Sequence, residues 1–253
     1  MNVFQALIIA LFVYLGSIGT PWLCGNTGGW YTLGRPLIAS MIVGIVMGDM
    51  TTALTVGVAL QAMYIGVITP GAVLPFDVAY AGYLVPALII GAKADPAIAT
   101  TLAVAAAMIG VALWNVVYVA NLAAVHRADK YAAAGDTKGI RRCNMFFAQA
   151  INFVVRAVPA FIILYFGSNA LQSIVLPPML ISYLGVVSGM LPALGIGLLL
   201  NMIIREKAYI GVFIVGFVIS AYLNLPIIAI AVIGAVIAVF YYRSAAAKAK
   251  MEV

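Results

Sequence analysis

Long apolar blocks, separated by short polar segments, run through most of this chain. Eight of them are long enough to cross the hydrocarbon core of a membrane as helices, which takes about 20 residues. These blocks cover approximately residues 3–19, 52–68, 73–92, 98–123, 144–166, 182–203, 208–224 and 226–242. No block shows the alternation over about 10 residues that is typical of outer-membrane barrel strands. The pattern therefore predicts an all-α polytopic membrane protein with about eight spanning helices.

A ninth apolar block, Leu37 to Val46, is too short to span. As a helix it would rise only about 15 Å, half of the ~30 Å hydrocarbon thickness. Glycine and proline are frequent between residues 16 and 110, where helices either pack closely through small residues or are interrupted. We favour interrupted helices, with short re-entrant or half-helix segments, because Asp49, Gln61 and Asp77 fall in the same region.

Composition also indicates a membrane protein. Hydrophobic residues make up 66% of the 253 residues and charged residues only 8%, against about 25% charged residues in soluble domains. Lipid is therefore expected to be the outer solvent of a single integral membrane domain, 1–253. The net charge of +6 comes from the loops and the tail, so it indicates orientation and not nucleic-acid binding.

Basic residues cluster in the segments 126–142 and 243–253. Because cytoplasmic loops collect Lys and Arg, we expect a cytoplasmic basic loop at 126–142 and a cytoplasmic tail at 243–253. Four predicted spans precede the basic loop. The N-terminus is then expected in the cytoplasm as well, provided that residues 37–46 do not cross.

Asp77 and Gln61 are the first candidates for binding a polar solute within the membrane. Asp77 follows Pro70-Gly71 and Pro75-Phe76, where a helix is expected to restart, and its carboxylate can accept hydrogen bonds from sugar hydroxyls. The purely structural alternative is that Asp77 caps the N-terminus of the next helix. Gln61 offers a donor and an acceptor to a polyol, or an amide bond between helices.

Asp49 and Arg35 flank the short apolar block. Capping of the next helix is the stronger explanation for Asp49, and direct substrate contact is the alternative. Arg35 is expected to pair with Asp49 or Asp77 or to reach a lipid headgroup. Arg156 is more typical of an ion-pair member than of a ligand.

Aromatic residues and the search for catalytic motifs give less information about the function of this chain. Trp22, Trp30 and Tyr31 fit an interfacial aromatic belt. The sequence has no phosphate-binding loop, no HExxH motif and no cluster of metal ligands, so neither catalytic residues nor a cofactor or metal site are predicted. The single histidine, His126, lies in the basic loop.

Several motifs resemble the membrane component IIC of the mannose/fructose/sorbose family of the bacterial phosphotransferase system. They are Arg35-Pro36-Leu37-Ile38, Gly44-Ile45-Val46-Met47-Gly48-Asp49, Gly57-Val58-Ala59-Leu60-Gln61, Gly71-Ala72, Pro75-Phe76-Asp77, Ala128-Asp129-Lys130, Arg156-Ala157-Val158-Pro159 and Gly216-Phe217. The resemblance covers essentially the whole chain. Mannose-type members commonly have Glu at the position of Gln61 and Trp-Met-Asn at the positions of Val67-Ile68-Thr69. The stretch 20–31 also differs from theirs, so this chain departs from mannose-type members at three places.

The resemblance implies uptake of a hexose or hexose derivative across the bacterial inner membrane. It implies a IID membrane partner in an oligomeric complex, and cytoplasmic IIA and IIB proteins that carry the phosphoryl group, so that this subunit is not itself an enzyme. Core and scaffold sub-regions, built partly from re-entrant hairpins, are expected. Asp77, Gln61 and Thr69 are then the substrate-binding candidates, with Asp49 and Arg35 supporting the broken-helix region.

Two other functions remain open at this point. An ion-coupled secondary transporter would use an intramembrane Asp as its coupling group and deliver unmodified substrate. A scaffold subunit would use its polar residues only to join helices.

Overall fold

The computed structural model describes residues 1–67, 75–173, 178–204, 209–223 and 225–251. No strand occurs in these ranges, so the predicted all-α fold is confirmed. The chain divides into two compact units, Met1–Leu199 and Leu200–Val253. The first unit contains every described residue that the sequence singled out as a substrate-binding candidate.

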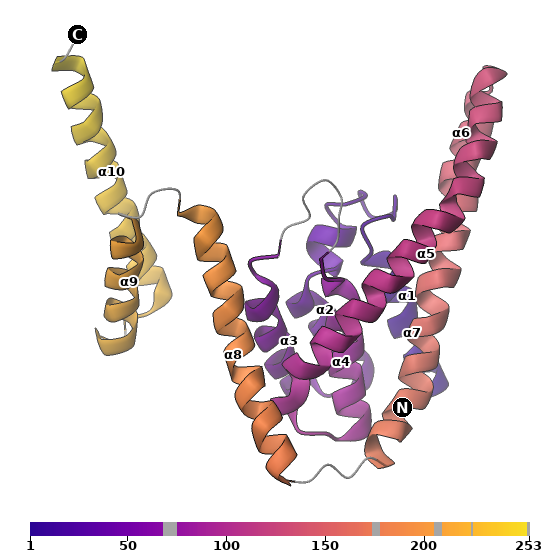
Figure 1. Ribbon diagram of the computed structural model, residues 1–253, viewed down its shortest axis with the longest axis horizontal. Coiled ribbons are helices and arrows are strands. Elements are labelled where there is room, and N and C mark those ends of the chain that lie inside the picture. The colour runs from indigo at the N-terminus through magenta and orange to yellow at the C-terminus, as the bar shows by residue number, and fades with distance from the viewer. Residues whose placement is uncertain (68–74, 174–177, 205–208, 224, 252–253) are drawn as a thin grey trace. The chain divides into compact units, whose positions relative to one another are not determined.

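Each predicted apolar block contains a helix. The first unit is built from α1 (Val3–Leu15), η1 (Gly29–Leu33), α2 (Pro36–Met47), α3 (Met50–Tyr64), α4 (Val78–Ala92), η3 (Pro96–Ile98), α5 (Ala99–Ala133), α6 (Thr137–Arg142), η4 (Cys143–Phe147), α7 (Ala148–Ser173) and most of α8 (Pro178–Ile203) (Figure 1). The remaining helices are α9 (Tyr209–Leu223) and α10 (Ile227–Met251).

The first four helices are short. They contain 12 to 15 residues each, which rise only about 18–22 Å. The blocks at 3–19, 52–68 and 73–92, predicted to span, therefore form helices shorter than the ~30 Å hydrocarbon core. Within the part of the chain that the structure describes, two helical stretches, Pro96–Ala133 and Thr137–Leu171, are long and apolar enough to cross a membrane by length and composition.

Helices α1 to α5 alternate in direction. The Gln5 side chain donates to the carbonyl of Val46, 3.1 Å away, so α1 and α2 are antiparallel. A Cβ on Gly57 in α3 would lie 2.7 Å from the Cβ of Ser40 in α2, so this second antiparallel pair packs closely because it has a glycine at the contact. The hydrogen bond from Tyr64 to the carbonyl of Ala103, 2.9 Å long, joins α3 to α5.

This alternation corrects the predicted topology. Met1 lies beside Gly91, near the α4–α5 turn, whereas Trp22, beyond the other end of α1, lines a cavity with Lys138 and Arg141. The N-terminus and the basic segment 126–142 therefore lie at opposite ends of this unit (Figure 1). The predicted shared side depended on residues 37–46 not crossing. That condition is not met, because α2 is a full reversal of the chain and makes five alternating helices instead of four.

Helix α4 is the centre of the first unit. Nearly all of its residues are buried, and it packs against α2, α3, α5 and α7. Trp30, predicted for an interfacial belt, is instead only 3% exposed and belongs to the same apolar core. The core therefore surrounds the N-terminal end of α4, where Asp77 lies.

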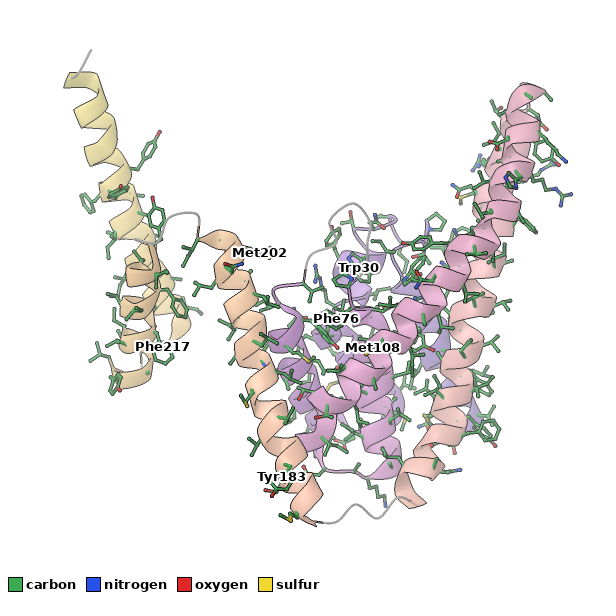
Figure 2. The ribbon with its side chains drawn as sticks, in the orientation of Figure 1. Trp30, Phe76, Met108, Tyr183, Met202 and Phe217 are labelled. Atoms are coloured by element: carbon green, nitrogen blue, oxygen red, sulfur yellow. The ribbon has the colours of Figure 1, made fainter. Side chains whose placement is uncertain are left out.

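Apolar side chains also cover much of the outer surface. Met108 on α5 is 61% exposed and Tyr183 on α8 is 57% exposed, and Figure 2 shows Tyr183 projecting outward from its helix. In the second unit, Phe217 on α9 is exposed as well. Large exposed apolar surfaces are expected where lipid or another membrane subunit covers the protein.

The basic segment 126–142 is mostly helical, although the sequence predicted a loop. Helix α5 continues as far as Ala133, and Asp136 then caps α6 by accepting a hydrogen bond of 3.0 Å from the Gly139 amide. The segment therefore forms a helical hairpin, whose second arm runs through η4 into α7.

Candidate functional site

Asp77 both caps α4 and forms a buried ion pair. Its Oδ1 accepts a hydrogen bond of 2.9 Å from the Tyr80 amide, and its Oδ2 lies 2.6 Å from Nη1 of Arg156 on α7. Both side chains are completely buried. The purely structural explanation for Asp77 was an N-terminal helix cap, and this explanation is correct for one carboxylate oxygen. The pairing with Arg156, and not with Arg35, accounts for the other.

Two aromatic rings surround the Arg156 guanidinium. Its Cζ lies 5.0 Å from the centroid of the Trp114 ring and 5.6 Å from that of Tyr80. At these distances the face of an aromatic ring attracts a cation, by about 2 kcal/mol where water is excluded. The charge of Arg156 is thus held by one carboxylate and two rings.

Gly110 allows α5 to approach this pair. A Cβ at Gly110 would lie 2.5 Å from the Cβ of Asp77 and 2.8 Å from its Oδ2. Any side chain at this position would therefore push the carboxylate away from Arg156. The amide of Asp77 also donates to the carbonyl of Ala107 on α5, at 3.4 Å.

Several polar atoms of this cluster have no hydrogen-bond partner among the described residues. On the pair itself these are Nε and Nη2 of Arg156, and beside it the Tyr80 hydroxyl and Nε1 of Trp114. Asn152, one helical turn before Arg156, donates to the Ser17 hydroxyl but leaves its own Oδ1 unpaired. Since each buried, unsatisfied polar group costs about 1–3 kcal/mol, such a concentration is characteristic of a functional site.

Helix α3 brings Gln61 toward the same region. The Tyr64 ring lies 5.9 Å from that of Phe76, the residue before Asp77. Gln61 lies one turn earlier on α3, on the same face as Tyr64, and its buried Oε1 has no partner among the described residues. Gln61 therefore has an unused acceptor in the core from which α4 begins.

The other predicted site residues lie elsewhere. Asp49 caps α3 and directly follows the end of α2. At that end Met47 lies beside Gly91, near the last residue of α4. Asp77 stands at the opposite end of α4, and the 15 residues of this helix separate the two ends by about 22 Å. The Arg35 guanidinium lies over the Tyr31 ring, 5.5 Å from its centroid. Thr69 lies outside the described residues.

The sequence did not identify Trp114, Tyr80 or Gly110 as parts of the site. Tyr80 has a weak signal, because it stands three residues after a capping Asp. Trp114 and Gly110 lie on an apolar helix whose pattern does not show which face meets Asp77.

The chain matches the family described as "PTS system sorbose-specific iic component" over residues 3–240. It is 32% identical over 214 residues to the PTS system mannose-specific EIIC component of Escherichia coli (strain K12), covering 83% of this chain and 79% of that protein. It is 29% identical over 241 residues to the PTS system sorbose-specific EIIC component of Lacticaseibacillus casei, covering 93% of this chain and 84% of that protein.

Two solved structures are similar. One, titled "Structure of membrane protein", has a TM-score of 0.80 and 28% sequence identity, and the match covers 96% of both chains. The other is a chain of the mannose transporter ManYZ in complex with microcin E492, with a TM-score of 0.57, 28% identity and 96% of both chains covered. The chain therefore belongs to the sorbose-type IIC family of the phosphotransferase system (PTS), the sugar-translocating membrane subunits of bacterial inner-membrane permeases.

Proposed function

We propose that this subunit carries a hexose or hexose derivative, and that the sugar is phosphorylated as it enters by IIA and IIB partner proteins. The names of its relatives cover mannose, fructose, N-acetylgalactosamine and sorbose, which supports a hexose or hexose derivative as the substrate. The similar ManYZ chain comes from a complex, which supports assembly with a IID membrane subunit. Phosphoryl transfer then belongs to the partners.

We further propose that the sugar passes the polar cluster of Asp77 and Arg156. The observation that carries this proposal is the group of buried, unpaired polar atoms around the ion pair. A sugar hydroxyl is both a donor and an acceptor, so it can satisfy Nε of Arg156, the Tyr80 hydroxyl and Oε1 of Gln61 in turn. Thr69 is assigned to the same path on the resemblance alone.

Asp49 and Arg35 have supporting roles in this proposal. Asp49 caps the start of α3, whereas Arg35 stands immediately before Pro36 at the start of α2 and makes no side-chain capping hydrogen bond. Both therefore lie at the start of a short helix that carries or contacts the site. If the basic hairpin and the tail face the cytoplasm, as the positive-inside rule predicts, the N-terminus lies on the outer side.

The coupling is tested by the chemical form of the sugar that enters. The chain is expressed with a IID subunit and phosphocarrier proteins in a bacterium without hexose permeases, and uptake of labelled mannose, fructose, sorbose and N-acetylgalactosamine is measured. At least one is expected to accumulate as its phosphate, even when an uncoupler removes the ion gradient. Accumulation of free sugar that the uncoupler abolishes would show an ion-coupled transporter instead.

The site is tested with Asp77→Asn and its matched control, Asp49→Asn. Asn also caps helices well, so both substitutions remove one carboxylate charge and keep the cap. We expect uptake to fall roughly tenfold or more, equivalent to about 1.4 kcal/mol, only for Asp77→Asn. Equal uptake by the two variants, at equal amounts of inserted protein, would remove Asp77 from the sugar path and leave the family assignment intact.

A further inference from the structure

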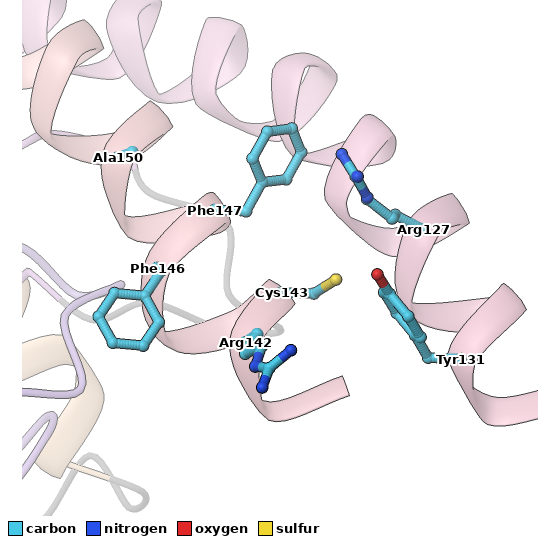
Figure 3. A pocket seen from close by; sticks show the side chains of 7 residues that line it. All are labelled: Arg127, Tyr131, Arg142, Cys143, Phe146, Phe147 and Ala150. Carbon is cyan, nitrogen blue, oxygen red and sulfur yellow. The ribbon is translucent and has the colours of Figure 1, made fainter. Parts of the chain in front are cut away.

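A cavity of about 380 Å³ lies between the arms of the basic hairpin. Arg127 and Tyr131 line it from the end of α5, and Arg142, Phe146 and Phe147 line it from the opposite arm (Figure 3). None of these residues belongs to the Asp77 cluster. The cavity is therefore a separate feature of the first unit.

The cavity is strongly basic. Residues 126–142 contain five Lys or Arg against two Asp, and one of these, Asp136, is occupied in capping α6. Among the described residues, neither Arg127 nor Arg142 has a carboxylate within ion-pair distance. Two guanidinium groups without an acidic partner on the wall of one cavity favour an anion with several oxygens, because each can donate two parallel hydrogen bonds.

The other half of the cavity is apolar. The Phe146 side chain is 70% exposed and that of Phe147 is 37% exposed, and Ala150 continues this wall. The Arg127 guanidinium lies over the Phe147 ring, 5.9 Å from its centroid. The aromatic wall and the charged wall are thus in direct contact, so a ligand that fills the cavity must be anionic at one end and apolar at the other.

The position along the helices agrees with such a ligand. The apolar part of α5 ends at Val125, and charged residues begin at Arg127. On the returning arm, the basic cluster of the hairpin ends at Arg142, and a mostly apolar stretch begins at Cys143. The cavity therefore lies where the hydrocarbon core of a membrane meets its headgroups, the level at which Arg and aromatic side chains gather.

We propose that this cavity binds an anionic phospholipid. The phosphodiester accepts hydrogen bonds from Arg127 and Arg142, with the Tyr131 hydroxyl as a further donor, and the first part of an acyl chain lies along Phe146, Phe147 and Ala150. Basic pockets between helices on the cytoplasmic side are known to suit anionic headgroups. A free phosphate ester shares the headgroup chemistry but leaves the aromatic wall exposed.

The test measures which lipid the protein retains. The full chain, with its membrane partner, is purified from nanodiscs of equal parts phosphatidylglycerol and phosphatidylcholine, and bound lipid is counted by native mass spectrometry. We expect enrichment of phosphatidylglycerol, and a roughly tenfold loss of it in Arg127→Ala and in Arg142→Ala. Lys130→Ala, an exposed residue of the same hairpin that does not line the cavity, is the charge-matched control and is expected to change retention less than twofold.

Three outcomes would overturn the proposal. Equal losses in all three variants would mean diffuse attraction to the membrane surface and no site. Stabilisation against heat by inorganic phosphate or glucose 6-phosphate, dependent on Arg127, without enrichment of phosphatidylglycerol would mean a soluble anion. Unchanged lipid retention together with weaker binding of the phosphocarrier proteins would mean a protein docking surface.

Two controls separate binding from folding. Because Arg127 is exposed, its replacement is expected to leave the thermal midpoint in phosphatidylcholine unchanged. Arg127→Lys keeps the positive charge but loses the planar guanidinium that donates two parallel hydrogen bonds, so it is expected to give intermediate lipid retention.

Discussion

Asp49 and Asp77 begin two neighbouring helices in the same way and differ in everything else. Each accepts a hydrogen bond on Oδ1 from the amide three residues later, at 3.0 Å for Asp49 and 2.9 Å for Asp77. Asp49 is partly exposed. Asp77 is fully buried and holds Arg156 with its second oxygen. Capping therefore explains why an acidic residue stands at both positions, but not why an arginine is buried opposite one of them.

The difference identifies a buried ion pair that costs free energy of folding and that helix capping does not require. Burying two charges costs several kcal/mol for each ion, and replacing a buried pair by apolar residues of similar volume is often neutral or stabilising. The pair also leaves two nitrogens of Arg156 without partners among the described residues. A helix cap needs none of this, as Asp49 demonstrates. The additional groups at Asp77 therefore support the proposal that the sugar passes this cluster.

The largest effect is expected for Arg156→Met, which breaks the pair on one side. It leaves the Asp77 carboxylate buried without its partner, so stability should fall by about 3–5 kcal/mol. Thermal unfolding of the purified protein, followed by tryptophan fluorescence, measures this. Lys130→Met, at an exposed basic residue on α5 that does not line the hairpin cavity, is the control and should leave the midpoint nearly unchanged.

The double variant Asp77→Asn/Arg156→Met separates structure from function. It removes both charges and keeps an Asn cap on α4, so most of the stability lost in Arg156→Met should return. Sugar uptake should stay abolished. Uptake at the wild-type level by this variant would mean that the pair, like Asp49, is only structural.

The sequence predicted one half of the Asp77 environment and missed the other. The turn residues before Asp77 indicated a restarting helix, and capping is a local interaction that spacing along the chain can show. The partner, Arg156, stands 79 residues away on α7. Apolar positions surround Arg156 on α7 and Gly110 on α5, so no periodic pattern showed which faces of these helices meet.

The direction of the helices before the basic segment could not be predicted from the sequence, for a related reason. Hydropathy measures the length of apolar blocks, and the block at 37–46 was too short to count as a crossing. In the folded unit, however, α2 reverses the chain as completely as its longer neighbours, because it packs between α1, α3 and α4. Whether a short helix turns the chain over depends on these packing partners and not on its own length.

A smaller effect is expected for Gly110→Ala, which tests how closely α5 must approach Asp77. The added methyl group would overlap the carboxylate, and overpacking of a core typically costs about 1–3 kcal/mol. Uptake should fall with stability, because the carboxylate is displaced from Arg156. Gly197→Ala on α8, where a Cβ would meet nothing within 4 Å, should leave both the midpoint and uptake unchanged.

The smallest effect is expected at Asp49, and its pH dependence sharpens the contrast. Hydrogen bonds from Thr52 lower the pKa of the Asp49 carboxyl. A carboxyl whose pKa is depressed in the folded protein adds stability above its unfolded pKa of about 3.9 and loses it as the pH falls through the folded value. Asp49→Ala should therefore lower the thermal midpoint slightly at pH 7, and the difference from wild type should vanish in acid.

Asp49→Asn isolates the charge, because it keeps the capping acceptor. Its midpoint should lie between those of wild type and Asp49→Ala at pH 7, with sugar uptake unaffected. The comparison of the two aspartates fails if Asp49→Asn abolishes uptake while the protein stays folded. In that case the carboxylate at the far end of α4 would also act on the sugar, and the path would have to extend along the whole of that helix.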